Sequence, residues 1–196
     1  GIPYLGGVTA NLEANIEADL ENFFFSFMDN TLTINDLPLQ FEGNFAMPTS
    51  DMVMDIRFNS PQSAFRSFLS LIPAMYAADF EGLETGGTMG FSGSVKGTYG
   101  ENSYPGFNIN LEVNDGMFNY PDLPSSVENV NINANINNPG PDLDLTEIDI
   151  PQFDLEMAQH PVGVTFNLKT PMSDPQIKST MNGVIDLGTV ESFYPL

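Results

Sequence analysis

The chain has 196 residues, 41% of them hydrophobic, and its 26 acidic side chains against five basic ones give a formal net charge of -21. This charge excludes nucleic-acid binding, which needs clustered cations to replace the counterions of phosphates, and it disfavours docking on an anionic membrane surface. The absence of cysteine excludes thiol catalysis and cysteine-ligated metals. No apolar run reaches the roughly 18 residues that a membrane-spanning helix needs.

The N-terminal segment predicts a long amphipathic strand over residues 8–20. Hydrophobic residues occupy every second position there, with Thr, Asn, Glu and Asp between them. Because successive strand residues point to opposite faces, this period of two gives the strand one apolar and one polar face. The apolar positions are Val8, Ala10, Leu12, Ala14, Ile16, Ala18 and Leu20.

The same alternation returns along the chain and predicts further strands with polar turns between them. It is clearest at 32–34, 52–58, 107–113, 130–136 and 162–168. The segments between them are rich in Asn, Asp, Gly, Pro and Ser, the residues that turns favour. The predicted turns are Asp29-Asn30, Pro48-Thr49-Ser50, Asn114-Asp115-Gly116 and 137–141. Successive amphipathic strands with short turns indicate an antiparallel meander.

One segment departs from this alternation and predicts a short amphipathic helix at about 61–72. Ser60 is a favourable N-cap, and Pro61 is a favourable first helical residue. Hydrophobic residues then recur at helical spacing as far as Ile72, and Pro73 ends the run. We expect this helix to pack on the apolar face of the sheet.

The predicted fold is mainly β: a long curved antiparallel sheet, arranged as a trough or as a sandwich, with that one helix. Long amphipathic strands expose far more apolar surface than a soluble monomer usually leaves uncovered, so something must cover the apolar face. A second sheet covers it in a sandwich, and a hydrophobic ligand covers it in a trough. The alternation of large and small apolar residues from Val8 to Leu20 suits both arrangements.

A weak internal echo bears on domain organisation. Residues 34–61 and 148–171 each contain a short segment that begins with isoleucine and ends in proline, then an amphipathic strand, then a second proline. We expect a single β-rich domain over 1–196, in which two weakly similar repeats cover about 30–82 and 83–196.

No pattern in the sequence predicts catalysis. His160, the only histidine, lies in a predicted Gln-His-Pro turn, and no GxSxG motif accompanies it. The acidic stretch 142–149 alternates with hydrophobic residues and lacks the glycine of a calcium loop, so we interpret it as the exposed face of a strand. Gly86-Gly87 and Gly93 precede no predicted helix and do not form a phosphate-binding loop. We expect no enzyme activity, no cofactor and no metal site.

Short phrases of the sequence, taken in order, resemble the AsmA-like family of bacterial envelope proteins. The resemblance covers roughly residues 30–196. The phrases are Ser70-Leu71-Ile72-Pro73 with Tyr76 and Asp79-Phe80, Thr85-Gly86-Gly87, Phe91-Ser92-Gly93, Lys96-Gly97, residues 114–124, Asn129-Val130-Asn131-Ile132, residues 169–175, and residues 183–187.

The resemblance implies a periplasmic module of a protein held in the inner membrane by an N-terminal helix that this chain lacks. We therefore interpret the chain as a fragment. The family is similar to bridge-like lipid-transfer proteins, whose β-sheets form an apolar trough for phospholipid acyl chains, and this favours the trough over the sandwich.

The expected function is a lipid-handling structural module that helps phospholipid transport or outer-membrane homeostasis. The alternative is a β-sandwich module that binds glycan or protein partners without a role in lipid handling. The residues expected to line the lipid groove are Val8, Leu12, Ile16, Leu20, Ile109, Leu111, Val130, Ile132, Val164 and Phe166.

Overall fold

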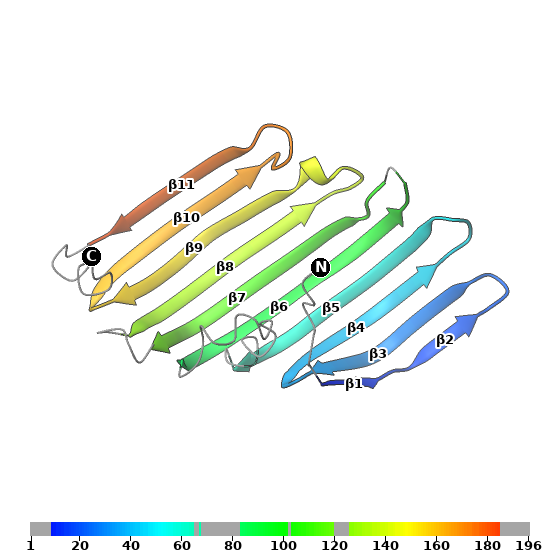
Figure 1. Ribbon diagram of the computed structural model, residues 1–196, viewed down its shortest axis with the longest axis horizontal. Helices are drawn as coiled ribbons and strands as arrows, with labels where there is room; N and C mark the ends of the chain where they lie inside the picture. The colour runs from blue at the N-terminus through cyan, green and yellow to red at the C-terminus, as the bar shows by residue number, and fades with distance from the viewer. Residues whose placement is uncertain (1–8, 65–66, 68–82, 102, 120–125, 185–196) are drawn as a thin grey trace.

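In the computed structural model the described residues are built mainly from β-strands that form one continuous sheet (Figure 1). The structure describes residues 9–64, 67, 83–101, 103–119 and 126–184. The strands are β1 (Ala10–Glu13), β2 (Ile16–Asp19), β3 (Phe24–Ile34), β4 (Leu37–Ala46), β5 (Met52–Ala64), β6 (Glu84–Tyr99), β7 (Gly106–Asn119), β8 (Val127–Asn138), β9 (Glu147–Met157), β10 (His160–Lys169) and β11 (Gln176–Gly183), with a 3-10 turn η2 (Leu143–Leu145) before β9.

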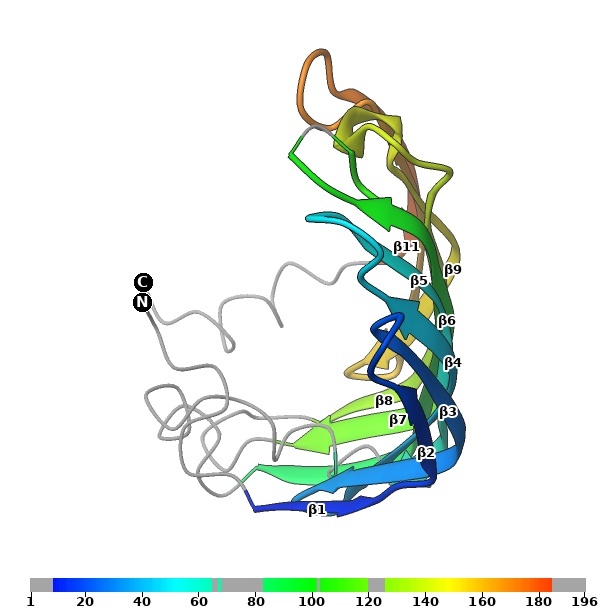
Figure 2. The same ribbon diagram turned by 90° about the vertical axis from the view of Figure 1, so that its right-hand side faces the viewer.

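The sheet is an antiparallel meander of 11 strands in the order β1-β3-β4-β5-β6-β7-β8-β9-β10-β11, with β2 also paired to β3. Each strand from β3 onward pairs with the next strand in the sequence, so every connection is local. Figure 2 shows that the sheet curves into an open trough and does not close on itself. The predicted mainly-β, curved antiparallel sheet is confirmed.

The described strands form a single layer. Every pair of elements in extensive contact consists of two strands that are neighbours in the sheet. Within the described part of the chain, no second sheet therefore packs on either face. Of the two arrangements that the strand pattern left open, these residues adopt the trough.

Bulges within the strands stand where the sequence predicted turns. The pairing of β3 with β4 shifts between Phe27 and Asn30, and the pairing of β7 with β8 shifts between Val113 and Gly116. Asp29 and Asp115 lie at these shifts with positive φ of 53° and 49°, a conformation that Asp tolerates better than most residues. Extra residues at such bulges bend a strand and increase its twist. The two predicted turns are therefore wrong, and each segment bends one long strand.

The predicted strand over 8–20 is divided into two short strands. Both β1 and β2 pair with β3, and they are separated at Ala14 and Asn15, opposite the bulge in β3. Leu20 lies beyond β2, in the turn that leads to β3, and Val8 lies outside the described residues. The residues of β3 between Phe27 and Thr31 interrupt the ladder opposite Ala14 and Asn15, so the facing segment forms two short strands.

The predicted helix does not begin at residue 61. Residues 61–64 are the end of β5, and the remainder of the predicted range lies outside the described residues except for Ser67. The pairing of β5 with β6 shifts between Ser60 and Ser63, so Pro61 lies at a bulge. Proline has no N–H to donate to the sheet, and bulges are among the few strand positions that accept it. The Ser-Pro pair that suggested a helix start is therefore a strand irregularity.

Candidate functional site: the concave apolar face

Strand register places hydrophobic side chains on one face of the whole sheet. Residues directly opposite each other in an antiparallel pair point to the same face, so a row of partners can be followed from strand to strand. One such row crosses β4 to β11 and consists of Phe41, Phe58, Gly93, Ile109, Ile136, Ile148, Leu168 and Ile177. A second row crosses β6 to β11 and consists of Met89, Val113, Ile132, Phe153, Val164 and Met181.

The opposite face is polar along equally long rows. The row beside the first apolar one crosses the same eight strands and consists of Glu42, Arg57, Ser94, Asn108, Asn137, Glu147, Lys169 and Gln176. The two faces therefore differ sharply in polarity from β4 to β11, as the period of two predicts.

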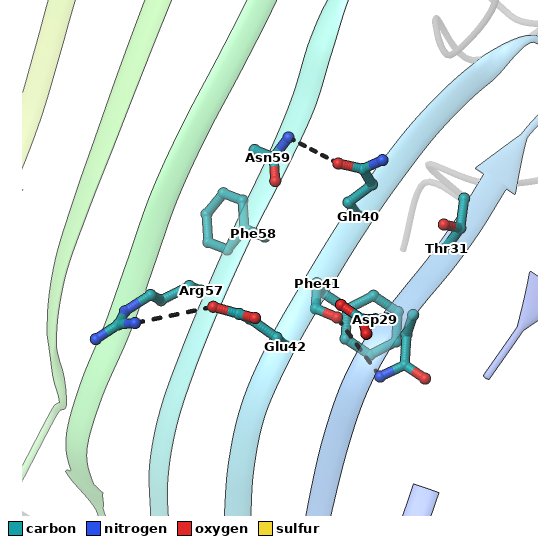
Figure 3. Close-up of a pocket in the computed structure, with 9 residues that line it drawn as sticks. Asp29, Thr31, Gln40, Phe41, Glu42, Arg57, Phe58 and Asn59 are labelled. Carbon is teal, nitrogen blue, oxygen red and sulfur yellow. Dashed lines mark hydrogen bonds and ion pairs between the residues drawn. The ribbon is translucent and has the colours of Figure 1, made fainter. Parts of the chain in front are cut away.

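The apolar face lines the concave side of the trough. Figure 3 views the sheet from the convex side, with Arg57, Glu42 and Asn59 in front of the strands and the Phe58 ring behind them. The hydrophobic rows share the face of Phe58, so they line the inner side of the curve seen in Figure 2. We call this surface the concave apolar face; it consists of the two apolar rows and the other residues on the same face of β1 to β11.

Eight of the ten predicted groove residues lie on the concave apolar face. Leu12 pairs with Leu32 and Ile16 pairs with Phe27 at one edge of the sheet. The remaining six lie on central or later strands; they are Ile109, Leu111, Val130, Ile132, Val164 and Phe166. The residues that pair with these six are all hydrophobic or small. Leu20 lies in the turn between β2 and β3, so it belongs to neither face of a strand. Val8 lies outside the described residues. The strand pattern therefore identified the correct face for every predicted residue that lies in a described strand.

An aromatic cluster on the same face was not among the predicted groove residues. The ring centroids of Phe27 and Phe41 are 5.8 Å apart, and those of Phe58 and Phe91 are 6.1 Å apart. The alternation of Leu37, Leu39 and Phe41 is the sequence signal that could have identified it. Gly93 makes room for these rings, since a Cβ there would lie 2.6 Å from the Phe58 ring. This end of the concave face is therefore aromatic.

The concave face is buried in its centre and open at its edges. Val113, Val127 and Val130 form the buried cluster, and Met89, Phe118, Ile132, Phe153, Leu155 and Met157 pack against it. Large hydrophobic side chains toward the edges are instead in contact with solvent, among them Leu12, Ile16, Ile177 and Met181. The face therefore combines a packed floor with reachable apolar margins.

The convex face carries the described ion pairs and a shallow polar hollow (Figure 3). The hollow has a volume of about 480 Å³ and is lined by side chains of β3, β4 and β5. Arg57 lies 3.8 Å from Glu42, and the Asn59 amide donates to the Gln40 oxygen at 3.1 Å. An ion pair this exposed contributes little to stability. The hollow can offer amide and carboxylate groups to a polar molecule.

Neighbouring donors lower the pKa of several convex carboxylates. The Asn167 amide, and then the Lys169 ammonium 3.0 Å away, lower the pKa of Glu147 below its usual value. A hydrogen bond from Lys96 at 2.7 Å lowers the pKa of Asp55 in the same way. Both groups are therefore held ionised, which suits a hydrated outer surface and gives no proton donor for acid–base chemistry near neutral pH.

Among the residues that the structure describes, no three His, Asp or Glu side chains are grouped so that they could hold a metal ion. His160 does not lie in a turn as predicted: it is the first residue of β10 and pairs with Met157. The hairpin turn consists of Ala158 and Gln159, both with positive φ. The acidic stretch predicted as a strand face begins instead with the η2 turn, and only Glu147 and Asp149 lie on β9.

No family model, no curated protein and no solved structure matches this chain. Within the described ranges, no helix has the length and hydrophobicity that crossing a bilayer requires.

Proposed function

We propose that this chain is a lipid-handling structural module whose concave apolar face shelters the acyl chains of phospholipids. The observation that carries the proposal is the unbroken apolar row from Phe41 to Ile177 on a single open layer of strands. Soluble proteins normally cover such a face with a second layer; in the described residues no second layer of strands covers it, and a ligand can reach its exposed margins.

The size of this face supports a lipid-sized ligand. Eleven strands spaced about 4.8 Å apart, with roughly ten residues each, present on the order of 1,700 Å² of sheet face. Soluble monomers rarely expose contiguous apolar patches above a few hundred Å². An acyl chain that covers part of the face gains about 0.8 kcal/mol for each methylene removed from water. The aromatic end and the exposed margins offer places where such a chain can enter.

The polar convex face has a complementary role in this proposal. The carboxylates of Asp55 and Glu147, whose pKa is lowered, stay ionised near neutral pH, and the net charge of -21 repels anionic headgroups. Acyl chains would therefore be held on one side only, while the other side keeps the module in solution.

The cellular setting of the proposal rests on the resemblance to AsmA-like proteins. In that setting the chain lies in the periplasm as part of a longer protein anchored in the inner membrane, and it helps phospholipid movement or outer-membrane homeostasis. No catalytic step, cofactor or nucleic acid is part of the proposal.

Photo-crosslinking at neighbouring positions tests the proposal. Leu111 and Glu112 are adjacent on β7 but point to the concave and convex faces respectively. A benzophenone side chain at Leu111, in chain incubated with phospholipid vesicles, should capture phospholipid at least tenfold more often than one at Glu112. Leu12 and Glu13 on β1 provide a second matched pair at the sheet edge.

Equal capture at the two members of each pair would indicate adsorption without a groove, and capture at neither would refute the proposal. Native mass spectrometry of the purified chain gives an independent measurement, in which bound lipid should appear as a mass increment that detergent removes.

The convex hollow favours a second candidate function, the binding of a glycan. Amide and carboxylate side chains such as Gln40, Asn59 and Glu42 can bond to sugar hydroxyls. The sandwich layout expected for such a module is not formed by the described strands, so this function would use the polar face alone. Calorimetric titration with oligosaccharides tests it, and loss of binding in Asn59→Ala with lipid capture intact would separate the two functions.

A further inference from the structure

The two edges of the described sheet share two properties: exposed apolar side chains and the absence of a neighbouring strand on the outer side. Side chains on the concave side of both edge strands remain widely exposed: Leu12 by 55% and Ile16 by 48% at one edge, Ile177 by 64% and Met181 by 60% at the other. In the described part of the chain, β11 has only β10 as a neighbour, and β1 and β2 have only β3. Unpaired strand edges are templates for pairing with another chain.

We propose that the β11 edge of one copy of this chain pairs with the β1–β2 edge of a second copy, head to tail. The sheet and its concave apolar face would then continue from one copy into the next. The pairing is a property of the edges and does not depend on what the concave face binds.

Strand direction permits this pairing. Every neighbouring pair in the sheet is antiparallel, so β3, β5, β7, β9 and β11 run one way, while β1 and β2 run the other way. A second copy placed beside the first in the same orientation therefore brings its β1–β2 edge antiparallel to β11. Antiparallel pairing is the only kind that this sheet uses, and the apolar faces of both copies stay on the same side.

The backbone groups that point outward at the two edges match in one register. Asn15 directs its N–H and its carbonyl oxygen toward β3, so the backbone groups of the alternate residues Leu12, Ala14 and Ile16 point away from the sheet. At the other edge, Val184 donates to Pro161 on β10, so the alternate residues Ile177, Ser179 and Met181 point outward. In the register that places Leu12 opposite Met181, Ala14 lies opposite Ser179 and Ile16 lies opposite Ile177.

This register also pairs the exposed hydrophobic residues with each other. Leu12 and Ile16 are as far apart in sequence as Ile177 and Met181, so both large pairs meet on the concave side. Cross-strand pairs of this kind stabilise sheets.

Charge favours two different edges over two identical ones. In the same register, Lys178 on the convex side lies opposite Asn15 and between Glu13 and Glu17. β11 contains no acidic residue, whereas β1 and β2 contain three, Glu13, Glu17 and Asp19. Pairing β1–β2 with itself would bring carboxylates together, and pairing β11 with itself would bring two Lys178 side chains close, which destabilises a sheet. The head-to-tail arrangement avoids both conflicts.

Cysteine crosslinking tests the pairing, because the chain has no cysteine of its own. Glu13 and Thr180 are exposed and would lie opposite each other in the proposed register, at a position where two Cα atoms approach to about 4.5 Å and a disulfide fits. A mixture of E13C and T180C chains under mild oxidation should give mixed disulfide dimers. The matched control replaces E13C by E112C, an equally exposed convex residue on the central strand β7.

The mixed dimer should form at least tenfold faster in the first mixture than in the control. Crosslinking of T180C to T180C alone would show β11–β11 pairing and overturn the head-to-tail arrangement. Equal rates in both mixtures would overturn the pairing altogether.

A second variant tests the same edges without crosslinking. In I177K/M181K two exposed side chains become charged, which leaves the packed centre of the sheet unchanged but blocks edge pairing. Sedimentation at physiological salt should show the unmodified chain self-associating as its concentration rises, and the variant at least tenfold more weakly, with an unchanged circular dichroism spectrum. A chain that stays monomeric up to about 1 mM would refute the pairing, as would unaltered association of the variant. These measurements contain no lipid, so their failure would leave the proposed lipid function untouched.

Discussion

The buried side chain of Asn30 accepts a hydrogen bond from the backbone N–H of Asn15 at 2.6 Å, at the point where β1 ends and β2 begins. Asn30 follows the positive-φ residue Asp29 in the β3 bulge, and its amide also reaches the carbonyl oxygen of Phe41 at 3.5 Å. One side chain therefore replaces the ladder hydrogen bond that the bulge removes. Together with the hydrogen bond from the Met28 N–H to the Asn15 carbonyl oxygen, it holds the segment between β1 and β2 against β3.

Asn30→Ala should loosen the β1–β2 edge. The substitution removes the acceptor of the Asn15 N–H in a partly buried hydrogen bond, which costs about 1 kcal/mol. Hydrogen exchange of the β2 amides should therefore accelerate, while exchange in β7 and β8 stays slow. The same chemical change at Asn11, an exposed residue of β1, is the control and should have little effect. Uniform acceleration across all strands would contradict a local role.

Val113 is the most buried member of the central cluster, and a charge there should destabilise the whole sheet. Val113→Asp buries an unpaired carboxylate against Val130 and Ile132, which costs several kcal/mol. Val113→Ala removes about two methylene equivalents and should cost about 2 kcal/mol. Chemical denaturation measures both. Glu112→Ala, at the neighbouring position on the convex face, should leave the unfolding free energy nearly unchanged. Equal effects at 112 and 113 would mean that the faces are assigned wrongly.

Asn138 fixes the loop between β8 and β9. Its buried amide donates to the carbonyl oxygen of Asp142 and to the Thr146 hydroxyl, both at 2.8 Å, and its oxygen accepts from the Gly140 N–H at 2.6 Å. Asn138→Ala leaves these groups unpaired and should lower the free energy of unfolding by about 1–3 kcal/mol or more. The exposed neighbour Asn137 serves as the control, since Asn137→Ala should change stability little. Thermal unfolding that is equal for both variants would refute this role.

Asp144 gives a pH-dependent contribution to stability. The Ser173 hydroxyl, the Ser173 N–H and the Met172 N–H all donate to its carboxylate, and they lower its pKa below the ordinary value of 3.8. Because the pKa of Asp144 is lower in the folded chain, its ionised carboxylate contributes its full stabilisation above pH 3.8. This stabilisation is lost as the pH falls through the pKa of Asp144 in the folded chain.

Asp144→Asn should therefore be less stable than the unmodified chain near neutral pH, and the difference should shrink in strong acid. Comparing the two chains at each pH cancels the repulsion among the other carboxylates. Thermal unfolding of both chains along a pH series measures this difference in stability. A difference that stays constant from neutral pH to well below 3.8 would show that the carboxylate charge has no part in holding the loop.

The predictability of the site can be judged from Ile132 and Leu20. Ile132 was placed on the apolar face by alternation alone, and strand pairing with Val113 and Phe153 confirms that face. Leu20 belongs to the same alternating run as Leu12, yet it falls in a turn. Alternation fixes the face of a residue inside a strand, but it does not say where the strand ends.

The sequence by itself determined that this protein is built from amphipathic antiparallel strands with one shared apolar face. Side-chain direction in a strand has a period of two, so Leu111 and Glu112 must face opposite ways wherever the strand lies. Local connections follow as well wherever short polar segments separate such strands, because those segments leave room only for hairpins.

Only the tertiary structure decided that Asn114-Asp115-Gly116 bends a strand and that Pro61 interrupts one. Turns and bulges use the same residues, because both need backbone groups released from the ladder and residues that tolerate positive φ. Which of the two forms depends on whether the chain continues against its neighbour, and for β7 that is fixed by the pairing of Gly116 with Val130 on β8. The choice between trough and sandwich has the same origin, since it depends on contacts between residues far apart in sequence, and local alternation carries no information about them.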